Sequence, residues 1–382
     1  MATENGKLRV LFFPSWYPTD PTPITGIFIK EYAKAASLYQ DVLVFYPYYS
    51  KKLEKYFIPD TKTTEEVKTI FIPLPNLLFL RYFFYFISSF FAFLWVKKDF
   101  KPQIIHAHVS SPAGITASIL GKIFGLPVII SEHQGPFSIH MRTVFHRLLV
   151  KWAMKKAEII LPVSKSLENQ IKSYNINAKF KVVPNIVDIH IFSLFSQESV
   201  GGIKKILIIS QLVEQKGIDY FLESINKLIK KGRKDFKVDI IGEGEKKEEY
   251  KNLVKELEIQ NFINFYSQKP KNELVKFIKE CNFLVLPSRH ETFGVVLIEA
   301  MACGKPVIAT KCGGPEEIVT KETGILVPPK DSIALAEAIN YMLDSYQKFN
   351  PKRIREYVKL NYSYAIISKK LDKIYKEIIY GY

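Results

Sequence analysis

Two glutamates, Glu291 and Glu299, lie eight residues apart around a predicted loop and the start of a helix. Glu291 follows the strand-like run 283–286, and Glu299 falls inside a helix that is expected to begin near Gly294. An ionised carboxylate only accepts hydrogen bonds, so it suits the hydroxyl groups of a sugar. The unpaired N–H groups and positive dipole end at a helix start suit a phosphate. The segment therefore offers partners for both halves of a sugar nucleotide.

The plain alternative is that Glu299 faces solvent on an ordinary amphipathic helix. Its neighbours Ile298 and Met301 are apolar, and a charge among apolar groups is costly unless it has partners. After the next predicted strand, Gly313–Gly314 precedes a helix that opens with proline. This pattern fits either a turn that approaches a phosphate or a simple turn, and both interpretations stay open.

Lys216 and Gly26 are further candidates for contact with a phosphate. Lys216 opens a helix after a predicted strand, where its ammonium group could serve as a point charge, although an ordinary surface lysine is the alternative. Gly26 follows the first predicted strand, where the missing side chain lets the backbone approach a ligand. The three spaced glycines of a dinucleotide fingerprint are not present, because Lys247 takes the third place after Gly242 and Gly244. We therefore reject a nicotinamide cofactor.

Three histidines lie at predicted strand ends, where reactive side chains of α/β proteins gather. His106 and His108 are expected to face opposite sides of their strand, and His133 ends another strand. These histidines have no helical pairing that would suit zinc, and no Asp-x-Asp pair follows a predicted strand. The three cysteines show no paired spacing, which argues against disulfides and structural zinc and favours a reducing compartment. We expect no bound metal.

The elements that must position these residues alternate between strand-like and helical runs along the whole chain. Apolar runs rich in Val and Ile, bounded by Gly or Pro, are typical of parallel strands buried on both faces. With helices between them they predict an α/β fold with two doubly wound parallel-sheet, Rossmann-like domains that face a cleft. The predicted strands are Leu8–Ser15, Asp41–Pro47, Thr69–Leu74, Gln103–His108, Pro127–Glu132, Glu158–Val163, Phe180–Val183, Lys205–Ser210, Phe236–Gly242, Ile263–Tyr266, Phe283–Pro287, Pro306–Thr310 and Gly324–Val327.

Domain boundaries follow from length and from a break in this pattern. A chain of 382 residues exceeds the usual size of one core. The alternation lapses in the polar stretch 187–202. We predict a first domain over residues 1–190, a second over 191–361, and a C-terminal helix over 362–382 that packs back toward the first domain.

The net charge of +16 limits the class of partner. The basic residues are spread among apolar ones, and neither an aromatic–basic RNA-binding motif nor a zinc-finger spacing occurs, so we expect no nucleic-acid partner. Anionic substrates and an anionic membrane surface remain. The N-terminus lacks the shape of a signal peptide. We expect a cytoplasmic protein, with peripheral contact to the inner face of the membrane as a further hypothesis.

Two segments carry that membrane hypothesis. Residues 77–96 form an apolar run close to the length of a membrane span, but Arg81 and two central serines interrupt it. It fits a helix packed on the sheet, a helix lying in the bilayer interface, or a span. Residues 145–156 place a basic stripe beside Leu148 and Trp152, which fits an interfacial helix or an ordinary solvated one.

Together these segments resemble the family-4 retaining glycosyltransferases of the GT-B fold over nearly the whole chain. The resemblance implies transfer of a hexose-like sugar from a nucleotide diphosphate donor to a hydroxyl of a glycan or lipid-linked acceptor, with retained anomeric configuration and without metal or other cofactor. It also implies a setting in cell-surface polysaccharide or glycolipid synthesis. The most specific match is PSRHETFGVVLIEAMACGKPVIAT, and the weaker ones are FPSWYPTDPTPITGIFIKEYAKA, IIHAH, VIISEH, ILPVSKSL, VVPNIVD and LVEQKGIDYFLESI.

The resemblance places the donor mainly on the second domain and the acceptor on the first. By analogy, Glu299 would hold the ribose hydroxyls and Glu291 would contact the transferred sugar. Backbone N–H groups at Phe293, Gly294 and Val295 would meet the sugar and the phosphates.

The remaining implied roles lie on both domains. Lys216 would neutralise the departing diphosphate, Gly26 would let the first domain close on it, and His133 would lie by the reacting sugar and the acceptor. The family usually has arginine at the position of Gln211, and glutamine keeps hydrogen bonding but loses the charge. Nearby Arg289 is the candidate to compensate.

Two other classes of function stay open at this point. Nucleotide-sugar epimerases share the two-sheet architecture, act on the sugar itself and need no acceptor. A basic binding protein with a weak catalytic site is the second alternative, and Gln211 is its support.

Overall fold

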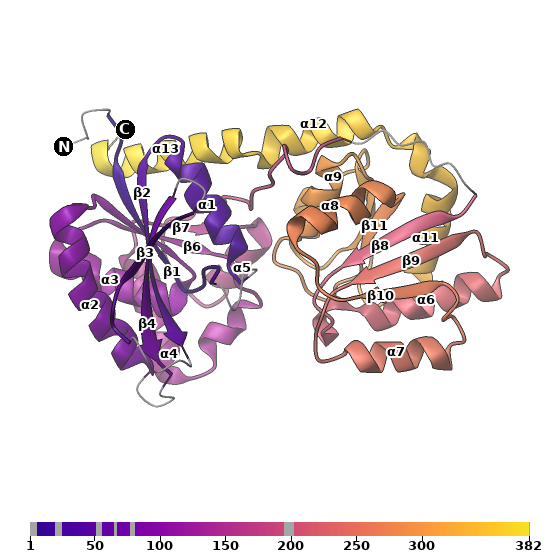
Figure 1. The fold of residues 1–382 in the computed structure, drawn as a ribbon, viewed down its shortest axis with the longest axis horizontal. Coiled ribbons are helices and arrows are strands. Elements are labelled where there is room, and N and C mark those ends of the chain that lie inside the picture. The colour runs from indigo at the N-terminus through magenta and orange to yellow at the C-terminus, as the bar shows by residue number, and fades with distance from the viewer. Residues whose placement is uncertain are drawn as a thin grey trace. The chain divides into compact units, whose positions relative to one another are not determined.

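The computed structural model describes residues 6–19, 25–50, 56–64, 67–76, 81–194 and 202–381. The chain divides into two compact units (Figure 1). Unit 1 comprises Met1–Ile186 together with Tyr364–Tyr382, and unit 2 comprises Val187–Ser363. The boundaries drawn from the sequence, at residues 190 and 361, lie four residues after Ile186 and two before Ser363. The C-terminal helix clusters with unit 1.

Unit 1 is built on a seven-stranded sheet with the order β3-β4-β2-β1-β5-β6-β7. All its strand pairs are parallel except the edge pair of β3 and β4. The helices α1 and α13 pack together, and α3 packs on both α2 and α4 (Figure 1). The bounds are β1 Arg9–Pro14, α1 Ile27–Ser37, β2 Asp41–Ser50, β3 Asp60–Thr64, β4 Val67–Pro75, α2 Arg81–Asp99, β5 Ile104–His108, η2 Ser110–Gly114, α3 Ile115–Phe124, β6 Val128–Glu132, η3 Phe137–Met141, α4 Val144–Lys156, β7 Ile159–Pro162, α5 Lys165–Lys172 and α13 Tyr364–Tyr380.

Two predictions for unit 1 were wrong. The edge strand β3 was missed, because its sequence DTKTT is polar and lacks the apolar run that marks a buried strand. The segment Phe180–Val183 does not form the predicted strand, because only a single bridge, between Phe180 and Ile160, joins it to the sheet. Tyr32 nevertheless donates from its hydroxyl to the carbonyl of Val183, at 2.6 Å, which ties this segment to α1.

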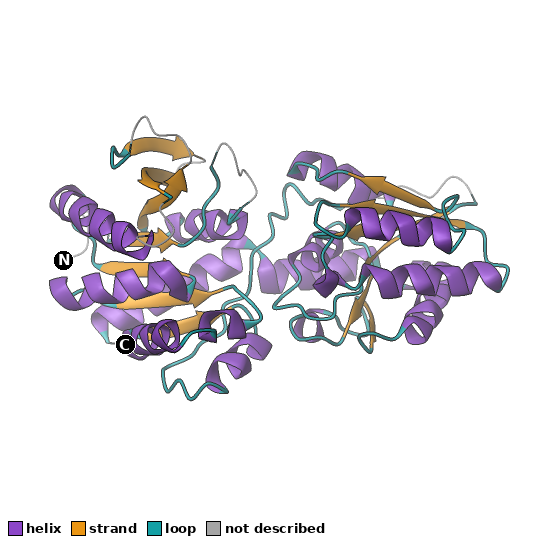
Figure 2. Cartoon of the chain, turned by 90° about the horizontal axis from the view of Figure 1, so that it is seen from below, coloured by secondary structure: helices purple, strands orange, loops and turns teal. Residues whose placement is uncertain are grey.

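Unit 2 is built on a six-stranded, fully parallel sheet with the order β10-β9-β8-β11-β12-β13. Strands alternate with helices that cover the sheet (Figure 2). All six predicted strands are present. The bounds are β8 Lys204–Ile209, η4 Glu214–Lys216, α6 Ile218–Lys230, β9 Phe236–Ile241, α7 Lys247–Glu256, β10 Ile263–Tyr266, α8 Lys271–Glu280, β11 Phe283–Leu286, α9 Val295–Ala302, β12 Val307–Thr310, α10 Pro315–Ile318, β13 Gly324–Val327, α11 Ser332–Ser345, η5 Tyr346–Lys348 and α12 Pro351–Tyr362.

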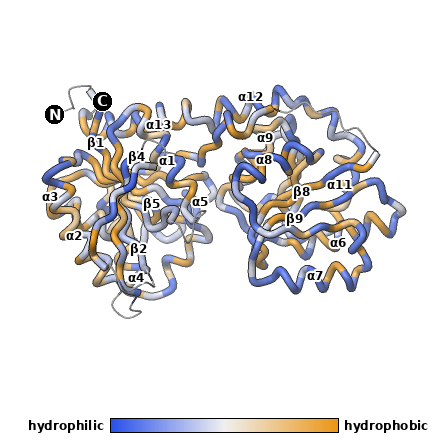
Figure 3. The backbone as a smooth tube through the Cα atoms, viewed as in Figure 1, coloured by the Kyte–Doolittle hydropathy of each residue, from blue (hydrophilic) through white to orange (hydrophobic). Residues whose placement is uncertain are grey.

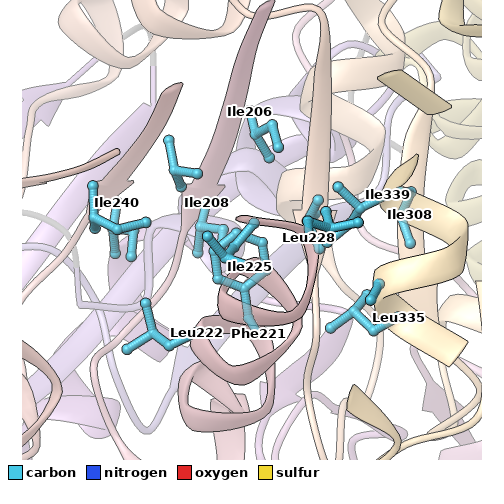
Figure 4. Packing of buried hydrophobic residues seen from close by; sticks show 14 of the residues in the cluster. Ile206, Ile208, Phe221, Leu222, Ile225, Leu228, Ile240, Ile308, Leu335 and Ile339 are labelled. Carbon is cyan, nitrogen blue, oxygen red and sulfur yellow. The ribbon is translucent and has the colours of Figure 1, made fainter. Parts of the chain in front are cut away.

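The core of unit 2 follows from the apolar runs on its strands and helices. Phe221, Leu222 and Ile225 lie on one face of α6 and are fully buried against Ile206 and Ile208 of β8 (Figure 4). Apolar residues gather along the central strands in each unit (Figure 3). Burial on this scale is the main favourable term in folding, at about 25 cal/mol per Å² of apolar surface. The predicted class of two doubly wound parallel-sheet domains is therefore confirmed.

The apolar segment 77–96 is a helix over its described part. Residues 77–80 lie outside the described residues, and α2 runs from Arg81 to Asp99. Tyr85, Phe93 and Val96 are buried, whereas Phe91 is 64% exposed. In the part of the chain that the structure describes, no helix combines the length and the apolar character needed to cross a bilayer.

Candidate active site

The sheet of unit 2 has a topological switch point between β8 and β11. The chain passes from β8 through β9 to β10 on one side, and from β11 through β12 to β13 on the other. Loops that leave the carboxyl ends of two such strands diverge, and the crevice between them is where ligands bind in open α/β sheets. Lys216 lies in the loop after β8 and Glu291 in the loop after β11. The sequence candidates therefore flank the crevice expected from topology.

Lys216 and Glu291 are in direct contact. The Nζ of Lys216 donates to the Oε2 of Glu291 at 2.6 Å, and the two side chains are 22% and 13% exposed. The hydroxyl of Ser288 donates to the same oxygen at 3.4 Å. The Coulomb attraction between two charges is larger where they are mostly shielded from water, although removing them from water has its own cost. The sequence suggested a phosphate for Lys216 and a sugar for Glu291, but it did not indicate that each is the partner of the other.

The backbone holds the two loops together. Gly217 has φ 61° and caps α6, and a Cβ there would lie 2.2 Å from the carbonyl oxygen of Pro287. The N–H of Arg289 donates to the carbonyl of Gln215 at 2.8 Å. Only glycine allows both this left-handed conformation and this close approach. The Lys–Gly pair at the start of α6 thus fixes the position of Lys216, and Gly217 is a site residue that the sequence analysis did not assign.

Arg289 was the candidate to compensate for the arginine that the family usually has at position 211, but its charge is already paired within the structure. Its guanidinium forms ion pairs with Glu214 and Asp219 and stacks over the ring of Tyr220, 4.9 Å from its centroid. Two carboxylates therefore offset its charge already. Gln211 is exposed just after β8.

The predicted helix start at Gly294 is present as α9. Gly294 is the N-cap with φ 100°, and the described helix continues over Val295–Ala302. The side chain of Phe293 is buried against the ring of Tyr362, at 5.8 Å between centroids, so only its backbone is a candidate for ligand contact. Glu299 is half-buried in the second turn of this helix. The residues directly before and after it, Ile298 and Ala300, are fully buried.

Gly313–Gly314 has a clear packing role. The N–H of Gly314 donates to the carbonyl of Glu291 at 2.9 Å, and a Cβ on Gly314 would lie 2.3 Å from the Cα of Phe293. A bridge also pairs Glu291 with Gly313. The loop after β12 can therefore pack against the loop that carries Glu291 only because it lacks side chains. This supports the structural interpretation of the glycine pair and makes it part of the support beneath Glu291.

Gly26 and His133 belong to unit 1. Gly26 caps α1 with φ 71°, and a Cβ there would lie 2.5 Å from the carbonyl oxygen of Trp16. The approach of the α1 start to the loop after β1 is sufficient reason for glycine at this position. His133 directly follows β6 and is buried, and its Nε2 lies 3.1 Å from the Nδ1 of His108. Both residues lie at the carboxyl edge of the unit 1 sheet.

The prediction that His106 and His108 face opposite sides was wrong. Their rings are stacked with centroids 4.3 Å apart, because side chains two residues apart on a strand point to the same face. His106 also contacts the hydroxyls of Tyr375 on α13, at 2.7 Å, and of Ser131, at 2.8 Å. The three histidines form a buried, hydrogen-bonded cluster rather than separate candidates.

Burial of this cluster makes stability depend on pH. Desolvation lowers the pKa of His106 and of His133 to about 3, and it lowers the pKa of His108 well below its usual value. A histidine whose folded pKa lies below its unfolded value binds a proton more readily when unfolded, so its stabilising contribution is complete above pH 6.5 and is lost as pH falls. The loss is about 1.4 kcal/mol per histidine at one pH unit below the unfolded pKa.

We therefore expect the melting temperature, followed by circular dichroism, to change little between pH 7.5 and pH 6.5 and to fall increasingly from pH 6.5 to pH 5. A His106→Gln variant should flatten this slope, because glutamine does not titrate and retains hydrogen-bonding capacity. A melting temperature that stays constant across this range would contradict the buried, neutral state of the cluster.

Metal binding remains a matter of prediction. Among the residues that the structure describes, no group of three or more His, Cys, Asp or Glu side chains is arranged to hold an ion.

Comparisons with known proteins agree with this arrangement. Residues 32–191 match the family described as Glycosyltransferase Family 4, and residues 190–360 match the family described as Glycosyl transferases group 1. An uncharacterized glycosyltransferase of Methanocaldococcus jannaschii is 29% identical over 279 residues, which cover 72% of this chain and 76% of the relative.

Solved structures show the same fold. A sucrose-phosphate synthase from Thermosynechococcus elongatus matches with a TM-score of 0.80 at 20% identity, over 98% of this chain and 100% of that one. HepE of Anabaena, solved with UDP, matches with a TM-score of 0.77 at 17% identity, over 97% and 100%. HepE has also been solved with UDP-glucose.

These matches define the protein as a glycosyltransferase with the GT-B fold. Within that class, the chain belongs to the family-4 glycosyltransferases, since the two family models together span residues 32–360. The interpretation as a glycosyltransferase enzyme is confirmed.

Proposed function

We propose that this enzyme transfers a hexose-like sugar from a nucleoside diphosphate donor to a hydroxyl of a glycan or lipid-linked acceptor, with retention of the anomeric configuration and without a metal. The observation that carries the proposal is the shielded pair of Lys216 and Glu291 at the switch point of the unit 2 sheet. A nucleotide sugar presents an anion to the lysine and hydroxyls to the glutamate. HepE, of the same fold, has been solved with such a donor.

In the proposed donor complex, a phosphate replaces Glu291 as the partner of Lys216. Glu291 then accepts hydrogen bonds from the sugar, and Glu299 accepts them from the ribose. The N–H groups at the start of α9, around Gly294 and Val295, face the diphosphate, because the first N–H groups of a helix have no partner within it. Stabilising the leaving group with fixed protein charges and dipoles is the main catalytic contribution available without a metal.

Retention follows if the acceptor attacks on the face that the diphosphate leaves. The bond between the anomeric carbon and the phosphate oxygen breaks, the acceptor oxygen bonds to that carbon, and the acceptor proton passes to the departing phosphate oxygen. His133 is neutral at pH 7, since its pKa is lowered to about 3 by burial. We therefore assign it hydrogen bonding on the acceptor side, together with Gly26 at the start of α1, and not the transfer of a proton as imidazolium.

Transfer assays with UDP-, GDP- and ADP-hexoses and candidate glycan or lipid-linked acceptors test this proposal. We expect nucleoside diphosphate release that depends on acceptor, a product with the anomeric configuration of the donor by NMR, and full activity after EDTA treatment. A product of inverted configuration would refute retention, and loss of activity in EDTA that is restored by a divalent cation would refute metal independence. A new nucleotide sugar formed from donor alone would instead indicate a nucleotide-sugar epimerase.

We also propose peripheral contact with an anionic membrane through α4. Phe145 and Leu148 are 74% and 60% exposed, and Arg147 and Lys155 are exposed on the same helix. Apolar and basic groups side by side are typical of interfacial helices. We expect flotation with anionic vesicles at low salt and its loss in an Arg147→Glu/Lys155→Glu variant. Wild-type protein that stays with the soluble fraction would contradict this contact.

A further inference from the structure

Unit 1 contains a pocket of about 700 Å³ at the carboxyl edge of its sheet. Trp16 after β1, Ser111 and Pro112 after β5, and Gln134 after β6 contribute to its wall. Carboxyl edges of parallel strands carry the ligand sites of α/β proteins, and the volume lies in the range of small-molecule sites. Gly26 and His133 follow the same strand ends. The pocket is therefore placed on the side of unit 1 where the proposed function puts the acceptor.

The wall of this pocket is largely apolar. Helix α2 contributes Tyr82 and Phe86, helix α3 contributes Ile115 and Ile119, and helix α4 contributes Phe145. Tyr82 and Phe145 are 60% and 74% exposed, so large rings lie uncovered at its rim. A site for a glycan alone would need polar groups for many hydroxyls. This wall suits a hydrocarbon chain.

The polar groups of the pocket favour an anion. Among the described residues that line the pocket, Arg142 carries a positive charge, and none is an aspartate or a glutamate. His140 also lines it and is only 3% exposed. Its Nε2 has no hydrogen-bond partner among the described residues, and the Oε2 of Glu132 lies 3.8 Å away. A buried polar atom without a partner points to a ligand group that would complete it.

We propose that this pocket binds the acceptor as a lipid: its hydrocarbon chain occupies the apolar wall, and an anionic headgroup lies beside Arg142. This deepens the proposed function, on which it rests, by naming the acceptor class. Phe83 lines both this pocket and a neighbouring groove of about 470 Å³, whose wall includes Phe57, Phe91 and Trp95. A chain too long for the first space can continue over Phe83 into the second.

Binding of dodecyl phosphate below its micellar concentration, measured by calorimetry without any donor, tests the proposal. We expect saturable binding at one site per chain. Ile119→Trp fills the pocket and should weaken binding about tenfold or more. Ile123→Trp is the matched control, because Ile123 lies one turn further along α3, is 54% exposed and does not line the pocket. Arg142→Ala should weaken dodecyl phosphate but leave neutral dodecanol unchanged.

A second pair of variants guards against misfolding. Phe145→Asp places a negative charge at the rim, where it repels the phosphate, and should weaken dodecyl phosphate binding. Val144→Asp should not weaken it, because Val144 is also exposed at the start of α4 but lies outside the pocket wall. Absence of saturable binding, or equal binding in wild type and Ile119→Trp, overturns the lipid site. Titration with nucleoside diphosphates reports separately on unit 2, so a failed donor site and a failed lipid site give different results.

Discussion

Replacing Glu291 by glutamine is expected to lower the rate of sugar transfer at least a hundredfold. The substitution keeps the shape of the side chain but removes the charge that pairs with Lys216 at 2.6 Å, and it replaces one of the two acceptor oxygens available to the sugar hydroxyls with an NH2 donor. Loss of a single positioned polar group in an active site typically costs about 10² to 10³ in kcat. Initial rates with a nucleotide sugar and an acceptor measure the effect. Because Glu291 is assigned to the reacting sugar, the loss should fall on kcat more than on KM.

The matched control for this experiment is Glu280→Gln. Glu280 pairs with Lys205 at 2.8 Å in the same unit, but Lys205 lies at the start of β8, at the opposite end of the strand from the site. Its removal should leave transfer close to wild type, because exposed ion pairs contribute little. Undiminished turnover in Glu291→Gln, with both proteins folded by circular dichroism, would refute the assigned role.

Gly217→Ala is expected to damage both stability and activity. The new Cβ would lie 2.2 Å from the carbonyl oxygen of Pro287, at a residue whose φ is 61°. A left-handed conformation costs a non-glycine residue roughly 1–2 kcal/mol, and the clash adds about 1–3 kcal/mol of overpacking. To relieve it, the loop of Lys216 must move away from the loop of Glu291. We expect a lower free energy of unfolding by about 2–5 kcal/mol, measured with urea, and a transfer rate at least tenfold lower.

Gly232→Ala separates the two causes. Gly232 has φ 89°, and a Cβ there would meet nothing within 4 Å. It therefore carries the conformational cost without the clash, and it lies after α6, away from Lys216. This variant should lose only about 1–2 kcal/mol and keep its transfer rate. Equal losses of activity in the two variants would contradict the view that contact between the loops positions Lys216.

Much of the fold was predictable because buried parallel strands leave a strong mark in sequence. Val- and Ile-rich runs identified every strand of unit 2. They failed for β3, whose sequence DTKTT can form an edge strand only through pairing with β4. The two strands are consecutive in sequence, with Thr64 paired to Val67, so β3 was missed because its polar sequence carries no apolar run to mark a strand. The bridge at Phe180 shows the converse, since an apolar run need not form a ladder.

The candidate site was predictable in its parts but not in its contacts. Lys216 and Glu291 could each be assigned to the end of a strand. They lie 75 residues apart in the sequence, and their pairing depends on β8 lying next to β11. The strand order sets that neighbourhood. The roles of Gly217 and Gly314 depend on close packing, since a Cβ on these residues would lie 2.2 Å from the carbonyl oxygen of Pro287 and 2.3 Å from the Cα of Phe293. Such approaches appear only once the loops are assembled.

A crystal structure of the enzyme with a bound nucleoside diphosphate is the sharpest test of the donor site at Lys216 and Glu291. We expect a phosphate oxygen within hydrogen-bond reach of the Nζ of Lys216, with the N–H groups at the start of α9 facing the diphosphate and Glu291 released from the lysine. A nucleotide bound elsewhere, with Lys216 and Glu291 still joined to each other, would contradict it.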